Sequence, residues 1–148
     1  DTRLANLAQP FLQQALQRDL TAGELALLTR AIPDIKPRVQ TVREIAEAAQ
    51  FYFQRIAPDE KAQKLLTPEA KIILQELASQ LAGLNDFTGH AIEDLARKMA
   101  ETKGLKLGAV AQPFRAALTG SSVSPPIFAA AELLGKTQVL ARLSNSIA

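Results

Sequence analysis

Apolar residues recur at the spacing of an α-helix along most of the chain. In residues 3–18, leucine and phenylalanine side chains fall on one face, as in an amphipathic helix. Further segments with this period follow at residues 21–31, 37–56, 67–83, 86–104, 107–120, 124–135 and from 136 to the end. No segment alternates apolar and polar residues with the period of two expected for a strand. The pattern predicts an all-α fold of about eight helices.

Capping residues and prolines indicate where these helices begin and end. Thr21 and Glu24 form the T-x-x-E pattern of a capping box. The Thr-Pro pair at residues 67–68 is a typical helix start, because threonine caps free N–H groups and proline has no N–H to lose. Pro10 should kink or break the first helix, and Pro33 should end the second.

The pattern also divides the chain into two small helical bundles. The polar segment Ala-Pro-Asp-Glu-Lys at residues 57–61 interrupts the apolar periodicity, as a connection between domains would. We therefore expect a first bundle at residues 1–57, a connector at residues 58–66 and a second bundle at residues 67–148.

The composition excludes several kinds of chemistry. Cysteine is absent, so neither a disulfide nor a thiolate metal site can form. His90 is the one histidine, and the sequence indicates no partner for it, so we expect no catalytic residue and no metal site. No apolar stretch is long enough to cross a membrane, and no secretory leader is visible, so a cytoplasmic location is expected.

Positive charge is concentrated towards the end of the sequence. Residues 1–96 contain 10 Lys and Arg against 13 Asp and Glu, whereas residues 97–148 contain 7 against 2. A basic end of this kind favours contact with a polyanion. Taken alone, a solvated surface without a partner explains it equally well.

One basic segment combines features that suit single-stranded nucleic acid. Residues 104–128 contain lysine and arginine, two helix starts distorted by proline, and a Gly-Ser-Ser loop at residues 120–122. Arginine and aromatic side chains can stack on unpaired bases or bond to their edges, and helix N-termini offer N–H groups. The alternative is structural: Phe114 and Phe128 then belong to the core, and residues 120–122 form a plain linker.

Several short motifs follow one another in this half of the chain. They are Gly104-Leu105-Lys106-Leu107-Gly108, Pro113-Phe114-Arg115-Ala116-Ala117-Leu118-Thr119-Gly120, Ser124-Pro125, Leu134-Gly135-Lys136 and Arg142-Leu143. Upstream, a K-x-R motif lies within residues 35–45, and an aromatic run follows at residues 51–53. Together they resemble the C-terminal anticodon-binding region of bacterial glutamyl-tRNA synthetases, which are class I enzymes. The resemblance covers about residues 35–148.

The resemblance implies two helical bundles that bind the anticodon stem-loop of a tRNA. Arg38, in the K-x-R motif, matches a residue that approaches the third anticodon base and can favour the C of glutamate anticodons over the G of glutamine anticodons. Arg115 matches a residue that contacts the first two anticodon bases. Arg97 matches a basic position that meets the backbone or the bases of the loop.

The resemblance also implies the surroundings of these contacts. The pocket in which the first two bases stack and bond would be lined by Ser124, Pro125, Ile127 and Phe128. Lys103 and Lys106 are expected to touch phosphate, which adds affinity but carries no sequence information.

The complete enzymes of this family attach glutamate to tRNA(Glu) with ATP and Mg. Their catalytic domain is not among these 148 residues, so we expect no catalysis and no cofactor in the chain alone. Some relatives also accept tRNA(Gln), and one arginine does not decide between the two specificities. No DNA or membrane partner is expected. The alternative is a helical protein-interaction module, with no RNA role, whose Leu and Ala faces bind partner helices.

Overall fold

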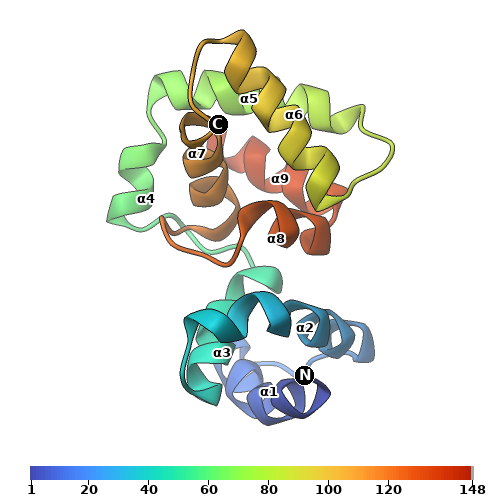
Figure 1. The fold of residues 1–148 in the computed structure, drawn as a ribbon. Coiled ribbons are helices and arrows are strands. Elements are labelled where there is room, and N and C mark those ends of the chain that lie inside the picture. The colour runs from blue at the N-terminus through green and yellow to red at the C-terminus, as the bar shows by residue number, and fades with distance from the viewer. Residues whose placement is uncertain (148) are drawn as a thin grey trace. The chain divides into compact units, whose positions relative to one another are not determined.

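The all-α prediction is confirmed by the computed structural model, which describes residues 1–147. These residues form nine α-helices and two short 3₁₀-helices, with no β-strand (Figure 1). The helices fall into two compact units, Asp1–Ile56 and Ala57–Ala148.

The first unit is built around helix α1 (Thr2–Leu16), which packs against α2 (Ala22–Ile35) and α3 (Val42–Ala49). Two 3₁₀-helices, η1 (Lys36–Arg38) and η2 (Gln50–Tyr52), lie on either side of α3 in the sequence. The core of this unit contains small, aliphatic and aromatic side chains, among them Ala5, Ala8, Leu12, Leu28, Ile32, Ile35, Ile45, Ala49, Phe51 and Tyr52.

The predicted capping box begins α2. The Glu24 N–H donates to Thr21 Oγ1 at 3.1 Å, and the Thr21 N–H donates to Glu24 Oε1 at 3.0 Å. Both contacts satisfy N–H groups that have no partner within a helix. The guanidinium of Arg18 donates to both Glu24 oxygens at 2.8 Å, so this helix start is also tied to the end of α1.

The helix breaks expected at two prolines do not occur. Helix α1 runs through Pro10, and α2 continues past Pro33 to Ile35. Both prolines are exposed, and apolar residues beside them are buried, with Ala8 and Leu12 flanking Pro10. Burial of these side chains offsets the one backbone hydrogen bond that each proline removes.

Residues 37–56, expected to form one helix, instead form η1, α3 and η2. The backbone is extended at Val39 and at Thr41, which interrupts the helical path. Thr41 then caps α3, because its Oγ1 accepts a hydrogen bond from the Glu44 N–H at 3.1 Å. The K-x-R motif therefore lies in a short turn and not at the start of a long helix.

The second unit contains six α-helices. They are α4 (Glu60–Leu65), α5 (Pro68–Ala82), α6 (Gly89–Thr102), α7 (Gly108–Thr119), α8 (Ile127–Leu134) and α9 (Lys136–Ile147). Helix α7 is central: it packs against each of the other five helices (Figure 1). Seven of its 12 residues are buried for that reason.

Helix α4 lies within residues 58–66, which the apolar pattern assigns to a connector. Asp59 caps this helix, because its Oδ1 accepts a hydrogen bond from the Ala62 N–H at 2.8 Å. Ala62 is buried, and α4 packs against α7. A single buried alanine in six residues leaves no periodic pattern for the sequence to reveal.

Other helix ends of this unit match their sequence signals. Thr67 caps α5 by accepting the Ala70 N–H at 3.1 Å, with Pro68 at the first helical position. Helix α7 ends at Gly120, whose φ of 72° lies in the left-handed region that glycine adopts without penalty. Gly135 alone separates α8 from α9, with a φ of 86°.

Candidate nucleic-acid interface

Arg115 and Ser124 lie close together in the second unit. Arg115 is half-buried on α7, and its Nε–H donates to Ser124 Oγ at 2.9 Å. The Ser124 hydroxyl in turn donates to the carbonyl of Pro125, which is itself buried, at 2.7 Å. The hydrogen bond of Nε fixes the plane of the guanidinium, so Arg115 is oriented by the segment that leads into α8.

The turn between these two residues is held by side-chain contacts. Thr119 is 4% exposed, and its hydroxyl donates to the Arg115 carbonyl at 2.8 Å. The Ser121 N–H donates to the same hydroxyl oxygen at 3.2 Å. The Val123 N–H donates to Ser121 Oγ at 3.1 Å. Residues 120–122 are therefore an organised turn and not a plain linker.

The two phenylalanines of the candidate segment have different exposures. Phe114 is fully buried, whereas Phe128 is half-buried at the start of α8. Their rings stack with centroids 6.1 Å apart and planes at 27°. Phe128 thus has one part against the core and another part open to a stacking partner.

Ile127 does not present a surface to a base. Its side chain is 2% exposed and packs in the core of the second unit. The resemblance places it in the lining of a base pocket, but a base could touch it only after α8 moved. Its role in this structure is to anchor the first turn of α8, beside Phe128.

Helix α6 approaches α8 at a glycine. A Cβ on Gly89 would lie 3.1 Å from the carbonyl oxygen of Phe128, which is closer than ordinary packing allows. The Gly89 N–H donates to Glu132 Oε1 at 2.7 Å, so a carboxylate from α8 caps the start of α6. Both contacts fix α8, and hence Phe128, against α6.

The predicted phosphate-contact residues and Arg97 lie on or just after α6. Arg97 is exposed and donates from Nε and from a terminal nitrogen to Glu93 Oε2, at 3.0 and 2.8 Å. Lys103 Nζ pairs with Glu76 Oε1 at 3.0 Å. Lys106 is exposed in the loop that leads to α7. Exposed ion pairs of this kind are weak, so Arg97 and Lys103 are free to exchange their carboxylate partners for another anion.

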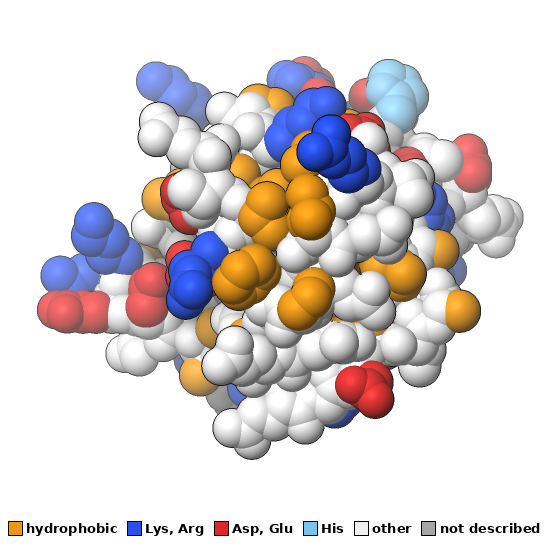
Figure 2. All heavy atoms as spheres, turned by 90° about the horizontal axis from the view of Figure 1, so that it is seen from below, with side chains coloured by type: hydrophobic (Ala, Val, Ile, Leu, Met, Phe, Trp, Pro, Cys, Tyr) orange, Lys and Arg blue, Asp and Glu red, His pale blue; other side chains and the backbone are white. Residues whose placement is uncertain are grey.

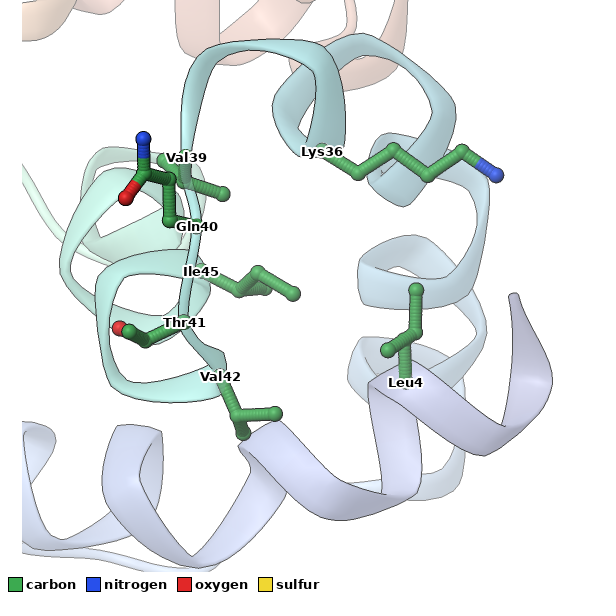
Figure 3. Close-up of a pocket in the computed structure, with 7 residues that line it drawn as sticks. All are labelled: Leu4, Lys36, Val39, Gln40, Thr41, Val42 and Ile45. Carbon is green, nitrogen blue, oxygen red and sulfur yellow. The ribbon is translucent and has the colours of Figure 1, made fainter.

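Arg38 lies in the first unit, at the end of η1, and is exposed. A cavity of about 180 Å³ opens beside this turn, lined by Leu4, Lys36, Val39, Gln40, Thr41, Val42 and Ile45. Leu4 and Ile45 point into it from α1 and α3, whereas Gln40 points away (Figure 3). Lys36 Nζ pairs with Asp1 Oδ1 at 3.1 Å. The turn that carries Arg38 thus borders a mostly apolar cavity, whose lining includes Lys36 but not Arg38 itself.

Among the ionisable groups of the first unit with shifted pKa values are Glu24 and Tyr52. Hydrogen bonds from Arg18, and then from the Thr21 backbone, lower the pKa of Glu24 to about 2. Burial raises the pKa of the Tyr52 hydroxyl, and the negative charge of Asp34 raises it further. Glu24 stabilises the start of α2. Tyr52 packs in the core and is too deeply buried to contact a ligand.

An apolar group of side chains is exposed on the face of the first unit that includes α1. Figure 2 shows hydrophobic side chains gathered there, bordered by Lys and Arg. Leu7 of α1 is 46% exposed. The guanidinium of Arg43 lies over the ring of Phe11, with its carbon 5.1 Å from the ring centroid. Such a surface suits either a protein partner or a stacked base.

Within the described residues, no group of three or more His, Cys, Asp and Glu side chains could hold a metal ion. His90 is exposed and lies 3.3 Å from Asp94, one turn further along α6. None of the described helices is both long and apolar enough to cross a membrane.

Several residues that organise the interface have roles that the motif comparison does not assign. Thr119, Gly89 and Glu132 fix the segments that carry Arg115 and Phe128, and buried Arg142 of α9 bonds to the last turn of α7. Arg142 had one signal in the sequence. It falls on the apolar stripe that contains Val139 and Leu143, where a charged residue is unexpected.

The described residues form an all-α domain of two helical units, and the second unit carries a half-buried, hydrogen-bonded arginine. The chain belongs to the family described as anticodon binding domain, whose model matches residues 3–147.

Similar proteins are much longer than this chain. It is 51% identical over 148 residues to glutamate–tRNA ligase 2 of Rhodospirillum centenum, which covers 99% of this chain and 32% of that protein. Glutamate–tRNA ligase 2 of Rhodospirillum rubrum is 44% identical over the same length, with the same coverage. The chain thus spans about a third of the curated relatives it matches, and these relatives are ligases.

A solved structure shares the fold. The crystal structure of a glutamate tRNA ligase from Elizabethkingia meningosepticum, in complex with its amino acid, matches with a TM-score of 0.78 and 28% identity. The match covers 97% of this chain and 29% of that one. The predicted resemblance to glutamyl-tRNA synthetases is therefore confirmed.

Proposed function

We propose that this chain binds the anticodon loop of tRNA(Glu), as one part of a glutamate–tRNA ligase. The observation that carries the proposal is the match to the anticodon-binding family over residues 3–147, with relatives named as glutamate–tRNA ligases over 99% of the chain. The oriented Arg115 next to Ser124 supports it from the structure, because a fixed guanidinium can bond to the edge of one base.

In the second unit, Arg115 contacts the first two anticodon bases. Ser124 and Pro125 orient it, since both are buried and joined by the hydroxyl–carbonyl hydrogen bond. The half-buried ring of Phe128 offers a face for one unpaired base, with the Phe114 ring behind it. Ile127 contributes indirectly, by anchoring the start of α8 in the core.

Exposed cations add affinity that does not depend on sequence. Arg97, Lys103 and Lys106 are exposed and contact phosphates of the loop. In the first unit, Arg38 reads the third anticodon base from the turn after α2. An exposed arginine can distinguish C from G there by bonding to one pattern of acceptors and meeting donors in the other.

For the whole protein we propose the activity for which its relatives are named, glutamate–tRNA ligase. The complete protein attaches glutamate to tRNA with ATP and Mg. The residues that catalyse this reaction are not among these 148 residues. Acceptance of tRNA(Gln) in addition to tRNA(Glu) depends on Arg38 and on contacts elsewhere in the protein. The cytoplasmic location stays a prediction.

The competing function is a protein-interaction module. The exposed hydrophobic side chains in Figure 2 favour it, because a partner helix could cover that surface. In that case, the arginines and lysines would contribute nothing specific to RNA binding.

A salt titration separates the two functions. The 148-residue chain is titrated with a fluorescently labelled anticodon stem-loop of tRNA(Glu), with the same stem carrying an unrelated loop, and with polyglutamate. If about three cations neutralise loop phosphates, the log–log slope of affinity against salt is about −2. We expect that slope and a preference for the glutamate anticodon. Equal affinity for all three polyanions would support the interaction module.

A further inference from the structure

Arg142 is a buried cation that lies at the C-terminal end of α7. It lies on α9 and is 3% exposed, and one of its terminal nitrogens donates to the Leu118 carbonyl at 2.8 Å. Leu118 is in the last turn of α7, where carbonyl groups lack partners within the helix. The C-terminal end of a helix also carries partial negative charge. Arg142 therefore caps α7 from a neighbouring helix, both by hydrogen bonding and by charge.

The turn after Leu118 is restrained on its other side as well. The Gly120 carbonyl accepts a hydrogen bond from the Asp59 N–H at 2.9 Å, at the start of α4. The Gly120 N–H donates to the Ala116 carbonyl at 3.0 Å. The turn is thus held from α4 and α9 together.

Arg115 and Ser124 both depend on this turn. Arg115 lies one helical turn before Thr119, whose hydroxyl bonds to the Arg115 carbonyl at 2.8 Å. Ser124 lies a few residues after Gly120, and it accepts the Nε–H of Arg115 at 2.9 Å. If the last turn of α7 shifts, the two partners of this hydrogen bond move relative to one another.

Capping of α7 requires a hydrogen-bond donor at position 142, which an apolar residue cannot supply. Burying a charged group is unfavourable, and a well-packed apolar residue of similar volume often stabilises a core at least as well. The neighbours of Arg142 on the buried face of α9 are Val139, Leu143 and Ser146. A guanidinium in that row supplies a donor to the Leu118 carbonyl of α7.

We propose that Arg142 is a positioning residue for RNA binding by Arg115. By holding the last turn of α7, it arranges Arg115 and Ser124 before the RNA arrives, so that binding does not have to order them. The inference rests on the proposed tRNA-binding function. It adds a residue of α9 that makes no contact with RNA itself.

The test is a double-mutant cycle on the 148-residue chain. Arg142→Met, which keeps length but removes the charge and the donors, is combined with Arg115→Ala, and Kd for the tRNA(Glu) anticodon stem-loop is measured well below the unfolding temperature. Arg142→Met should raise Kd by about tenfold, the order expected when a contact loses its preorganisation. In the Arg115→Ala background it should change Kd by less than about twofold, because the residue it positions is gone.

Two controls separate positioning from stability. Leu143→Ala destabilises the same helix without touching the α7 carbonyl, so it should lower Tm and leave Kd unchanged. Arg142→Lys keeps a charged donor and should restore most of the affinity. Hydrogen exchange at the Ser121 and Val123 amides should become faster in Arg142→Met and not in Leu143→Ala, because those amides belong to the restrained turn.

Each outcome decides the matter. An equal rise in Kd with and without Arg115, a matching rise in Leu143→Ala, or unchanged exchange at Ser121 would overturn the positioning role while leaving tRNA binding intact. Failure of the unmodified chain to prefer the glutamate stem-loop would instead overturn the proposed function itself. If Arg142→Met does not fold, Arg142→Gln takes its place in the same cycle.

Discussion

The two units present their candidate arginines in different ways. Arg38 lies in an exposed 3₁₀ turn beside a small, mostly apolar cavity. Arg115 is half-buried on the central helix of its unit, with Nε already bonded to Ser124. A preorganised group loses little freedom on binding, whereas an exposed one must be ordered by the ligand. We therefore expect the second unit to supply most of the affinity and the first unit to adjust discrimination.

The largest expected effect is at Arg115. Arg115→Ala should weaken binding of the glutamate anticodon stem-loop by about 1–3 kcal/mol, the range for loss of a bidentate base contact. Arg30, exposed on α2 and assigned no contact, is the matched control, and Arg30→Ala should leave Kd unchanged. Fluorescence anisotropy gives both values. Equal effects of the two substitutions would remove the distinction between an oriented and a merely exposed arginine.

Arg38 should affect discrimination more than affinity. Arg38→Gln should reduce the preference for C over G at the third anticodon base by about 1 kcal/mol, the lower end of the range for a base-edge contact, because the turn is exposed. The measurement is Kd for two stem-loops that differ at that base. If the preference is the same before and after substitution, the first unit does not read this base.

Substitution of Gly89 tests how tightly α6 packs against α8 in the second unit. Gly89→Ala should destabilise the chain by about 0.5–1 kcal/mol, because the cost of crowding the Phe128 carbonyl exceeds the gain in helix preference. Gly108 holds the same first position on α7, and a Cβ there meets nothing within 4 Å. Gly108→Ala should therefore be neutral or stabilising. Urea unfolding compares the two, and a stabilising Gly89→Ala would mean that α8 yields easily.

The smallest effect concerns the acid sensitivity of the first unit. The pKa of Glu24 is lowered to about 2, so its contribution is complete above its ordinary pKa near 4.5 and is lost as pH falls towards 2. Glu24→Gln should cost about 0.5 kcal/mol at pH 7, since the pair is partly exposed. The difference from the unmodified chain should vanish near pH 2. Thermal unfolding at both pH values measures it, and a difference that grew on acidification would contradict the sign.

Much of the fold is predictable because local signals agree with burial. The capping box at Thr21 and the Thr-Pro start at residues 67–68 appear in the structure as predicted. Predictions failed where packing outweighed a local rule. Helix α2 continues through Pro33 because Ile35 is buried beyond it, and α4 forms although only Ala62 gives it a buried face.

The sequence predicts the residues of the candidate interface, but it does not predict their geometry. The motif comparison singles out Arg115 and Ser124, yet their hydrogen bond depends on a turn whose shape is set by Gly120 and by contacts from α4 and α9. Ile127 shows the same limit. It belongs to the segment that the motifs single out, but its side chain is buried in the core, and sequence position alone could not reveal that orientation.

Because Gly135 alone joins α8 to α9, the two helices must move together. With no slack between Leu134 and Lys136, α8 cannot slide along its axis without pulling the start of α9 with it. The junction also needs a φ of 86°, which a residue with a side chain adopts only under strain. Insertions or branched residues there would detach the helix that carries Phe128 from the helix that carries Arg142. An engineer who grafts new specificity onto α8 therefore has to move the two helices as one block.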